Sequence, residues 1–296
     1  WGVAMARRQK GRHLVTSAVE HPAVLQACRY LQREHGFSLT LVPVGGDGRV
    51  DPDAVRRALR SDTVLVSLIH AQNETGVLQP VAEVGRLARE RGIPFHVDAS
   101  QSVGKLPVKV DALGCDLLSV AGHKMYAPKG VGALYVRDGL TPQPLLHGAG
   151  YEGGRRAGTA NVPYIVGLGV AAEMAAYALA TGEPERIRAM RDRLHRALGA
   201  RLDVRLNGHP TERLPNTLNV CVPGVVGNAL LARVPEVAAS TGSACHAGED
   251  HPSDVLLAMG VEPKLALGAL RLSLGRGTSD EEVDFAAERL AQAARG

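Results

Sequence analysis

Apolar and polar positions form alternating blocks up to about residue 140, and each block has the length of a strand or a helix. Residues 64–69 are an apolar run of the kind found in strands that are buried on both faces. Five more segments give strand signals: residues 13–18, 39–44, 93–97, 117–120 and 132–136. The pattern therefore predicts six strands in the first half of the chain.

Helical signals lie between these strands. Pro22 opens a helix that runs to about His35 and ends at Gly36, with proline in the first turn where its missing N–H costs nothing. A second helix starts at Asp51-Pro52, and a third covers Val81 to Ala88 at helical spacing. Strands separated by helices predict an α/β fold, with a mostly parallel sheet covered by helices.

The character of the chain changes after residue 160. The expected elements are helices over 165–179 and 185–202, a strand over 217–222, a Gly/Ser-rich loop at 240–248, a helix over 253–259, a strand at 270–274 and a helix over 280–294. This is the pattern of a smaller α+β domain. We place the boundary near residue 180, which gives a large domain over 1–180 and a small C-terminal domain over 181–296.

Composition excludes several classes of protein. Apolar residues make up 45% and charged residues 22%, which is ordinary for a globular protein. The net charge is +4, the only locally basic stretch is residues 7–12, and aromatics are 3%, so we expect no nucleic-acid partner. No apolar run looks long enough to span a membrane, so we expect no membrane partner. The four cysteines are far apart without metal-ligand spacing, which predicts a reducing, cytoplasmic location and no metal site.

The chemistry is clearest at two strand ends. Asp98 closes a predicted buried strand, where open α/β sheets bind ligands, and Lys124 follows the next strand. The chain has only 6 lysines against 28 arginines, so a lysine at this place is notable. Pyridoxal phosphate needs such a pair: a lysine that bonds its aldehyde, and a carboxylate that keeps its pyridine nitrogen protonated. Each residue alone reads more simply, as a helix cap and a solvated loop residue.

Seven short motifs follow one another along the chain: Glu20–Val24, Asn73–Gly76, His96–Gln101, Gly122–Lys124, Arg156–Thr159, Ser243–Cys245 and Leu270–Ser273. On these motifs the chain, from about residue 13 to its end, resembles the cysteine desulfurases of the class V aminotransferase type and is similar to the selenocysteine lyases. The resemblance implies a fold-type-I enzyme dependent on pyridoxal 5'-phosphate. It also implies removal of sulfur from L-cysteine as an enzyme persulfide, with release of L-alanine, for iron–sulfur cluster assembly or another sulfur transfer.

The resemblance implies a role for each matching residue. The expected cofactor-binding residues are Lys124 as the covalent attachment, Asp98 at the pyridine nitrogen, Asn73 and Gln101 at the ring oxygen, and His123 and Thr159 at the phosphate, with Thr159 from a partner subunit. His21 would stack on the ring and move protons, and Arg271 would bind the substrate carboxylate. Without the resemblance, His21 is a residue before a helix, Asn73 a turn residue and 156–159 a polar turn.

Cys245 is the expected nucleophile. It lies in a glycine-flanked loop over 241–248, next to His246, and a neighbouring imidazole raises the thiolate fraction of a cysteine. The other cysteines, Cys28, Cys115 and Cys221, read as small core residues. The long loop resembles the branch of the family that serves general iron–sulfur assembly, so we expect a sulfur-acceptor or scaffold protein and a homodimer as partners.

Two departures from the family pattern change the expectation for this chain. Ala121 stands where the family normally has a hydroxyl residue that binds the phosphate, a loss of roughly 1.5–3 kcal/mol if nothing replaces it. Nothing in residues 1–12 matches the family's opening Gly-Ala-Thr-Glu-type phosphate turn. We therefore expect that the chain starts downstream of this turn, binds the cofactor weakly and is nearly inactive.

Three alternatives stay open. A selenocysteine lyase would use the same residues on L-selenocysteine, and Ala121 slightly favours it because such enzymes often carry an apolar residue there. A kynureninase-like hydrolase of the same fold would need no catalytic cysteine. A non-catalytic fragment or scaffold would only bind sulfur-transfer partners.

Overall fold

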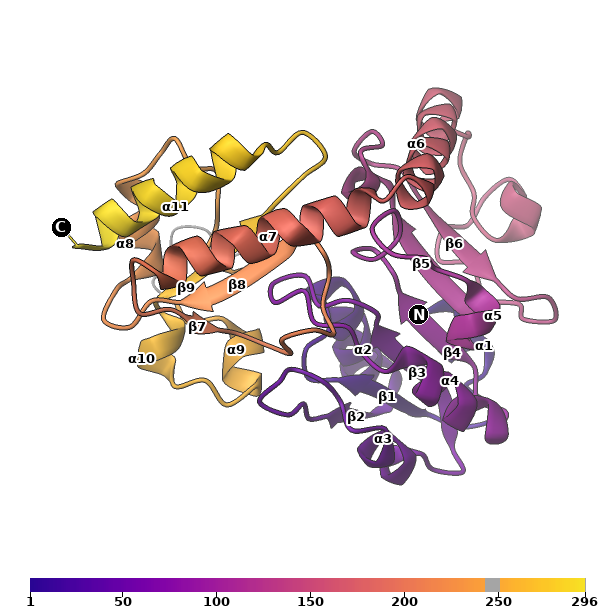
Figure 1. The fold of residues 1–296 in the computed structure, drawn as a ribbon. Coiled ribbons are helices and arrows are strands. Elements are labelled where there is room, and N and C mark those ends of the chain that lie inside the picture. The colour runs from indigo at the N-terminus through magenta and orange to yellow at the C-terminus, as the bar shows by residue number, and fades with distance from the viewer. Residues whose placement is uncertain (243–250, 296) are drawn as a thin grey trace. The chain divides into compact units, whose positions relative to one another are not determined.

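Strands and helices alternate along the first unit of the chain, which comprises residues 1–43, 50–70 and 79–177. The computed structural model describes residues 1–242 and 251–295. The strands of this unit are β1 (His13–Ser17), β2 (Ser38–Val42), β3 (Thr63–Ile69), β4 (Phe95–Asp98), β5 (Leu117–Ala121) and β6 (Gly132–Val136). They form one sheet in the order β2-β1-β3-β4-β5-β6 (Figure 1).

The sheet is parallel except at one edge. The pairs among β2, β1, β3, β4 and β5 are all parallel, and β6 joins β5 in the antiparallel sense. The α/β fold with a mostly parallel sheet is thus confirmed. The apolar run in β3 is buried almost throughout, as expected for a strand covered on both faces.

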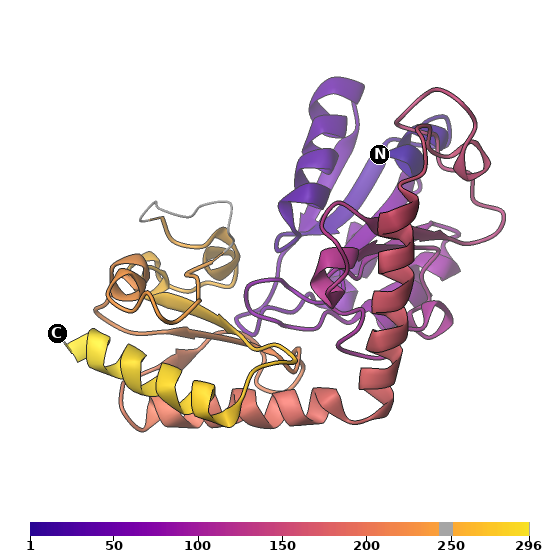
Figure 2. The ribbon, with the colours of Figure 1, turned by 90° about the horizontal axis from the view of Figure 1, so that it is seen from above.

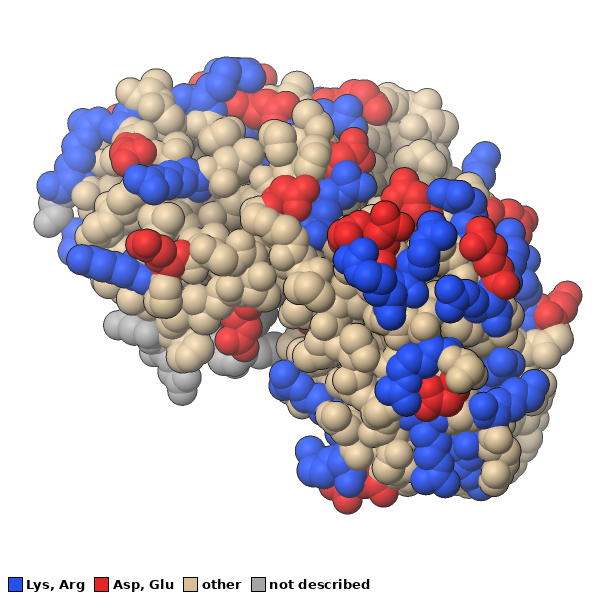
Figure 3. All heavy atoms as spheres, turned by 90° about the horizontal axis from the view of Figure 1, so that it is seen from below, with Lys and Arg blue, Asp and Glu red and all other residues tan. Residues whose placement is uncertain are grey.

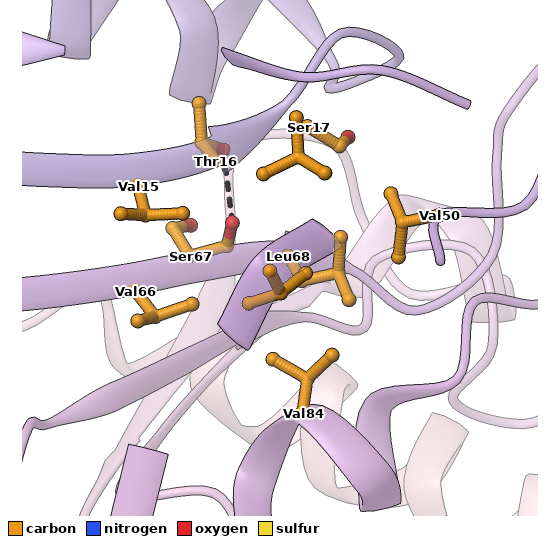
Figure 4. A pocket seen from close by; sticks show the side chains of 10 residues that line it. Val15, Thr16, Ser17, Val50, Val66, Ser67, Leu68 and Val84 are labelled. Carbon is orange, nitrogen blue, oxygen red and sulfur yellow. Dashed lines mark hydrogen bonds between the residues drawn. The ribbon is translucent and has the colours of Figure 1, made fainter. Parts of the chain in front are cut away.

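Helices cover both faces of this sheet. They are α1 (Gly2–Ala6), α2 (Pro22–His35), α3 (Pro52–Ala58), α4 (Val81–Glu90), α5 (Val110–Leu113) and α6 (Val162–Ala180), with short 3-10 turns η1 (Gly122–Met125) and η2 (Glu152–Gly154). On one face, Leu14 of β1 packs with Leu31 of α2 and Ala4 of α1. On the other, Val84 of α4 faces Val66 and Leu68 of β3 across a cavity of about 10 Å³, room for one water molecule (Figure 4).

Local signals set the bounds of α2. His21 caps its first turn, Pro22 occupies the first helical position, and Gly36 ends it in the left-handed conformation with φ 65°. The predicted helix over Pro22–His35 is confirmed residue for residue.

The helix α6 differs from expectation in one respect. With 19 residues, it is long and apolar enough to cross a membrane by length and composition. The expectation that no apolar segment reaches this length is therefore wrong for α6. Large apolar side chains are exposed along it: Val162, Tyr164, Ile165, Val166, Val170, Met174 and Tyr177.

The second unit comprises residues 44–49, 71–78 and 178–296. Residues 44–49 and 71–78 belong to it, although both precede the predicted boundary near residue 180. Its strands are β7 (Arg205–Leu206), β8 (Thr217–Cys221) and β9 (Ala269–Ser273), which form an antiparallel sheet. Its helices are α7 (Glu183–Gly199), α8 (Gly227–Ala232), α9 (Asp254–Ala258), α10 (Pro263–Ala266) and α11 (Asp280–Arg295).

The core of this unit forms between the sheet and two long helices. Figures 1 and 2 show α7 and α11 side by side, and they contact each other along their lengths. Leu194 of α7 and Leu290 of α11 pack with Leu270 and Leu272 of β9. Arg271, between the two leucines, faces away from this core, so the predicted alternation along β9 is confirmed.

Candidate active site

The predicted site residues of the first unit follow the carboxyl ends of neighbouring strands. His21 comes after β1, Asp98 ends β4, and Lys124 follows β5. Because parallel strands all end at the same edge of a sheet, these side chains lie along one edge. We call this edge, with the loops that follow the strands, the rim. The strand order reverses direction between β1 and β3, and open α/β sheets bind their ligands at such a switch point.

Asp98 is a buried carboxylate with 6% of its surface exposed. Its Oδ1 accepts a hydrogen bond from the backbone N–H of Ser100 at 2.9 Å, and its backbone carbonyl accepts one from the N–H of His70 at 2.9 Å. The turn that begins at Asp98 is therefore tied to β3 as well as to β4. A carboxylate fixed in this way is suited to accept a hydrogen bond from a protonated pyridine nitrogen.

His96 braces β4 two residues before Asp98. Its Nδ1 lies 2.8 Å from Ser67 Oγ on β3, and its Nε2 lies 2.9 Å from Ser119 Oγ on β5. Burial lowers the pKa of His96 to about 4, although the charge of Asp98 acts in the opposite direction. The ring is neutral at physiological pH and links three strands beneath the rim.

The loop after Asp98 carries Gln101 and Lys105. The Lys105 ammonium donates a hydrogen bond to the backbone carbonyl of Gln101 at 2.8 Å. Burial, and then the charge of Lys124, lower the pKa of Lys105 to about 8. The charges of Lys105 and Lys124 lie close enough to repel each other, so the Gln101 loop and the Lys124 turn are neighbours at this rim.

His123 and Lys124 lie on η1, and both side chains are exposed. Gly122 lets this turn pack closely, because a Cβ there would come within 2.7 Å of the Val131 carbonyl oxygen. The pKa of His123 is lowered by burial and by the charges of Lys124, Lys129 and Lys105. This cluster of cations suits an anion such as a phosphate.

His21 acts as the N-cap of α2. Its Nδ1 accepts a hydrogen bond from the backbone N–H of Ala23 at 3.1 Å. Because Nδ1 is an acceptor, the neutral ring carries its proton on Nε2. The ordinary interpretation of His21, a residue that starts a helix, is therefore correct as local structure, and it leaves Nε2 for another partner.

Thr159 is not joined to the other candidate residues by any hydrogen bond among the described residues. It is exposed in the loop between η2 and α6. Ala121, at the end of β5, is half-buried and brings no hydroxyl to the turn before His123.

Asn73 and Arg271 come together within the second unit. Asn73 lies in a turn, which agrees with its simpler interpretation as a turn residue. Its backbone carbonyl accepts a hydrogen bond from Arg271 Nη1 at 3.3 Å. Burial lowers the pKa of Arg271, while the charge of Glu74 raises it. The backbone of Arg271 also pairs with Ser240, since the Arg271 N–H donates to the Ser240 carbonyl at 2.6 Å.

Glu74 binds the segment that follows the predicted cysteine loop. Its Oε2 accepts a hydrogen bond from Ser253 Oγ at 2.6 Å, and Ser253 caps α9 by accepting from the N–H of Leu256. A Cβ added at Gly242 would come within 3.3 Å of the same Glu74 oxygen. Cys245 itself lies outside the described residues.

The other three cysteines are buried free thiols: Cys28, Cys115 and Cys221. Burial raises the pKa of Cys28 and that of Cys115 to about 11 each, and it raises the pKa of Cys221 as well. Their prediction as core residues is confirmed. Thiols of this kind are protonated and poorly nucleophilic at neutral pH.

Two ionisable residues of this rim were given no individual role in the sequence analysis. Glu20, directly before His21, is buried with 4% of its surface exposed. No local pattern announces a buried acid at that place. Lys105 could have been singled out, because lysine is scarce in this chain and Lys105 stands close to Asp98 in sequence.

The donor set fits pyridoxal phosphate: a buried carboxylate, an exposed lysine amine, an imidazole whose Nδ1 is held by the backbone, and a cluster of cations for the phosphate. Among the residues that the structure describes, no group of three or more His, Cys, Asp or Glu side chains is placed to hold a metal ion. Fold and rim together define a pyridoxal-phosphate-dependent transferase of fold type I.

Comparison with known proteins identifies the family. Residues 2–285 match the model of the class-V aminotransferases, and the chain belongs to this family. It is 49% identical over 288 residues to the cysteine desulfurase IscS of Anaeromyxobacter dehalogenans. The aligned residues cover 96% of this chain and 71% of that protein.

Solved structures agree with this assignment. A NifS-like protein superposes with a TM-score of 0.91 at 34% identity, covering 99% of this chain and 78% of the other. A structure described as SspA in complex with cysteine superposes with a TM-score of 0.78 at 37% identity, covering 92% of this chain and 76% of the other. The predicted family and fold type are confirmed.

Proposed function

We propose that this chain is a cysteine desulfurase, which takes sulfur from L-cysteine as a persulfide on Cys245 and releases L-alanine. The observation that carries the proposal is the rim that joins Asp98 and Lys124 at adjacent strand ends, in a chain whose relatives carry that name. The comparison structure that holds cysteine supports this substrate.

Pyridoxal phosphate, when bound, supplies an electron sink for the carbanion formed at the substrate Cα. Lys124 would hold the cofactor covalently, and the Asp98 carboxylate would accept a hydrogen bond from its protonated ring nitrogen. His123 would donate to the phosphate, within the positive field of Lys105 and Lys124. Gln101 and Asn73 would bind the ring oxygen, and Thr159 of a partner copy would complete the phosphate site.

His21 and Arg271 would act on the substrate side. The Nδ1 of His21 is held by the Ala23 N–H, so the ring orientation is fixed while Nε2 moves a proton. The guanidinium of Arg271 is half-buried and braced on the Asn73 carbonyl, and its planar fork fits a carboxylate in two places.

The Cys245 thiolate would attack the sulfur of the substrate. An S–S bond would form and the substrate C–S bond would break; its electron pair would stay with the substrate carbon skeleton, and protonation of that carbon would give alanine. Cys28, Cys115 and Cys221 are buried and have raised pKa values, which leaves Cys245 as the candidate. A sulfur-acceptor or scaffold protein would then take the sulfane sulfur, in a reducing cytoplasm.

The exposed apolar side chains of α6 support a homodimer. Tyr164, Val166 and Met174 are each more than two-fifths exposed, and an apolar surface of this length is typical of an interface. We propose that a second copy of the chain covers α6, which also accounts for its membrane-like composition. Sedimentation of the chain would show a dimer, and Val166→Glu with Met174→Glu would give monomers.

Borohydride reduction after incubation with pyridoxal phosphate tests the cofactor assignment. Peptide mapping should place the adduct on Lys124, whereas an adduct on Lys105 would contradict it. Supplied with L-cysteine, the chain should form alanine and a persulfide at Cys245, at the low rate expected from weak binding of the cofactor, and Cys245→Ala should abolish the persulfide. Equal or faster turnover of L-selenocysteine than of L-cysteine would favour a selenocysteine lyase instead.

A further inference from the structure

Glu20 places a carboxyl group inside the protein at the switch point of the sheet. It lies in the connection from β1 to α2, and 4% of its surface is exposed. Its Oε1 accepts two hydrogen bonds, from Ser17 Oγ at 2.6 Å and from the backbone N–H of Ile69 at 2.9 Å. Ser17 ends β1, and Ile69 ends β3 (Figure 4 shows Ser17 beside the end of β3). One carboxyl oxygen thus joins two strand ends.

The second oxygen of Glu20 has no such partner. Oε2 is buried and makes no hydrogen bond to any of the described residues. Burial, and to a smaller extent the charge of Asp98, raise the pKa of Glu20 to about 8, against the effect of the hydrogen bonds from Ser17 and Ile69. At neutral pH the carboxyl group is therefore mostly protonated.

Asp98 is the residue of the predicted site whose charge acts on Glu20. Ile69, which donates to Glu20, pairs with Asp98 across β3 and β4. The titratable groups that interact electrostatically with Glu20 are Asp98 on β4 and Cys28 on α2, both anionic when they ionise. No described cation interacts with Glu20 strongly enough to offset a charge on it.

We propose that Glu20 is a positioning residue for Asp98: its buried carboxyl group joins the ends of β1 and β3 through Ser17 and Ile69, and Ile69 is the residue that pairs with Asp98 on β4. The inference rests on the role of Asp98 in the proposed function. When Glu20 loses its proton, a second negative charge appears in the same buried region, and the environment of Asp98 changes with it.

Glu20→Gln is the discriminating variant, because its amide oxygen accepts the same two hydrogen bonds and stays neutral at every pH. Glu90→Gln, on the exposed side of α4, is the matched control. In carboxyl-labelled chain, one glutamate resonance should titrate with a midpoint near pH 8, and Glu20→Gln alone should remove it. A Glu20 resonance that titrates near pH 4.5 would overturn the inference.

A second measurement connects Glu20 to Asp98. In chain loaded with pyridoxal phosphate, the cofactor absorbance should change with a midpoint near pH 8, and this change should vanish in Glu20→Gln but persist in Glu90→Gln. If the absorbance of Glu20→Gln follows the wild-type pH profile, Glu20 does not act through Asp98. If the chain binds no cofactor while the resonance near pH 8 remains, the proposed function fails and the neutral state of Glu20 stands.

Discussion

His21 has two roles, as the cap of α2 and as the proposed proton carrier, and two substitutions can separate them. Replacement by alanine removes the acceptor for the Ala23 N–H and removes the imidazole together. Replacement by asparagine removes the imidazole but keeps a cap, because the Asn side-chain oxygen is among the best acceptors at this position. The two variants therefore separate the structural role from the chemical one.

The expected magnitudes follow from the cap. Loss of one N-cap hydrogen bond costs about 0.5–2 kcal/mol, and Pro22 still starts the helix in both variants. For a unit of this size, about 1 kcal/mol lowers Tm by roughly 2–4 °C. His21→Ala should melt lower by that amount, whereas His21→Asn should melt with the wild type. Both should lose alanine formation to a similar extent, since proton transfer by a side chain typically contributes about 10²–10⁴-fold.

The assay pairs thermal unfolding with alanine release from L-cysteine on the same preparations. Equal binding of pyridoxal phosphate by the two variants, measured by absorbance, is the control that cofactor loss does not cause the effect. The reasoning would be refuted if His21→Asn kept wild-type turnover, because the imidazole would then serve only as a cap.

Three further predictions concern other parts of the chain. In the native protein an alkylating reagent should leave the buried Cys28, Cys115 and Cys221 unmodified. Labelling of any of the three, detected by mass analysis, would contradict this prediction. Ser253→Ala should lower the free energy of unfolding of the second unit by about 1 kcal/mol, since it removes both the cap of α9 and the bond to Glu74; Ser253→Thr should lose less. The pKa of His96 is about 4 in the folded chain, against 6.5 for an ordinary histidine in the unfolded chain. The neutral ring therefore contributes its full stability above pH 6.5, and this contribution declines as the pH falls from 6.5 to 4. The stability advantage of the wild type over His96→Gln should shrink by about 3 kcal/mol across that window in urea unfolding, and a constant difference would contradict it.

The parts of the fold that could be predicted depend on local signals. Pro22 and Gly36 bound α2, and both act through the conformation of a single residue. Leu270 and Leu272 flank Arg271 at the period of a strand, which identified the outward side chain of β9. Signals of this kind need no knowledge of what packs against the segment.

Features that depend on distant contacts were missed. The sequence does not indicate that β6 is antiparallel, because its pairing with β5 is decided by the course of the intervening chain. The short elements β7, α8 and α10 have too few residues for a periodic pattern. The burial of Glu20 is of the same kind, since the Ile69 N–H that stabilises it lies on another strand.

Asn73 shows how a long-range contact changes the meaning of a predicted site residue. It precedes the predicted domain boundary by more than a hundred positions, yet residues 71–78 belong to the second unit. Its backbone carbonyl holds the Arg271 guanidinium, and the Glu74 carbonyl accepts a hydrogen bond from Asn219 on β8. A residue proposed to contact the cofactor ring is therefore built into the same unit as the residue proposed to bind the substrate carboxylate. The hydrogen bond between Arg271 and the Asn73 carbonyl joins the two residues directly, so the two proposed binding functions are linked within one unit.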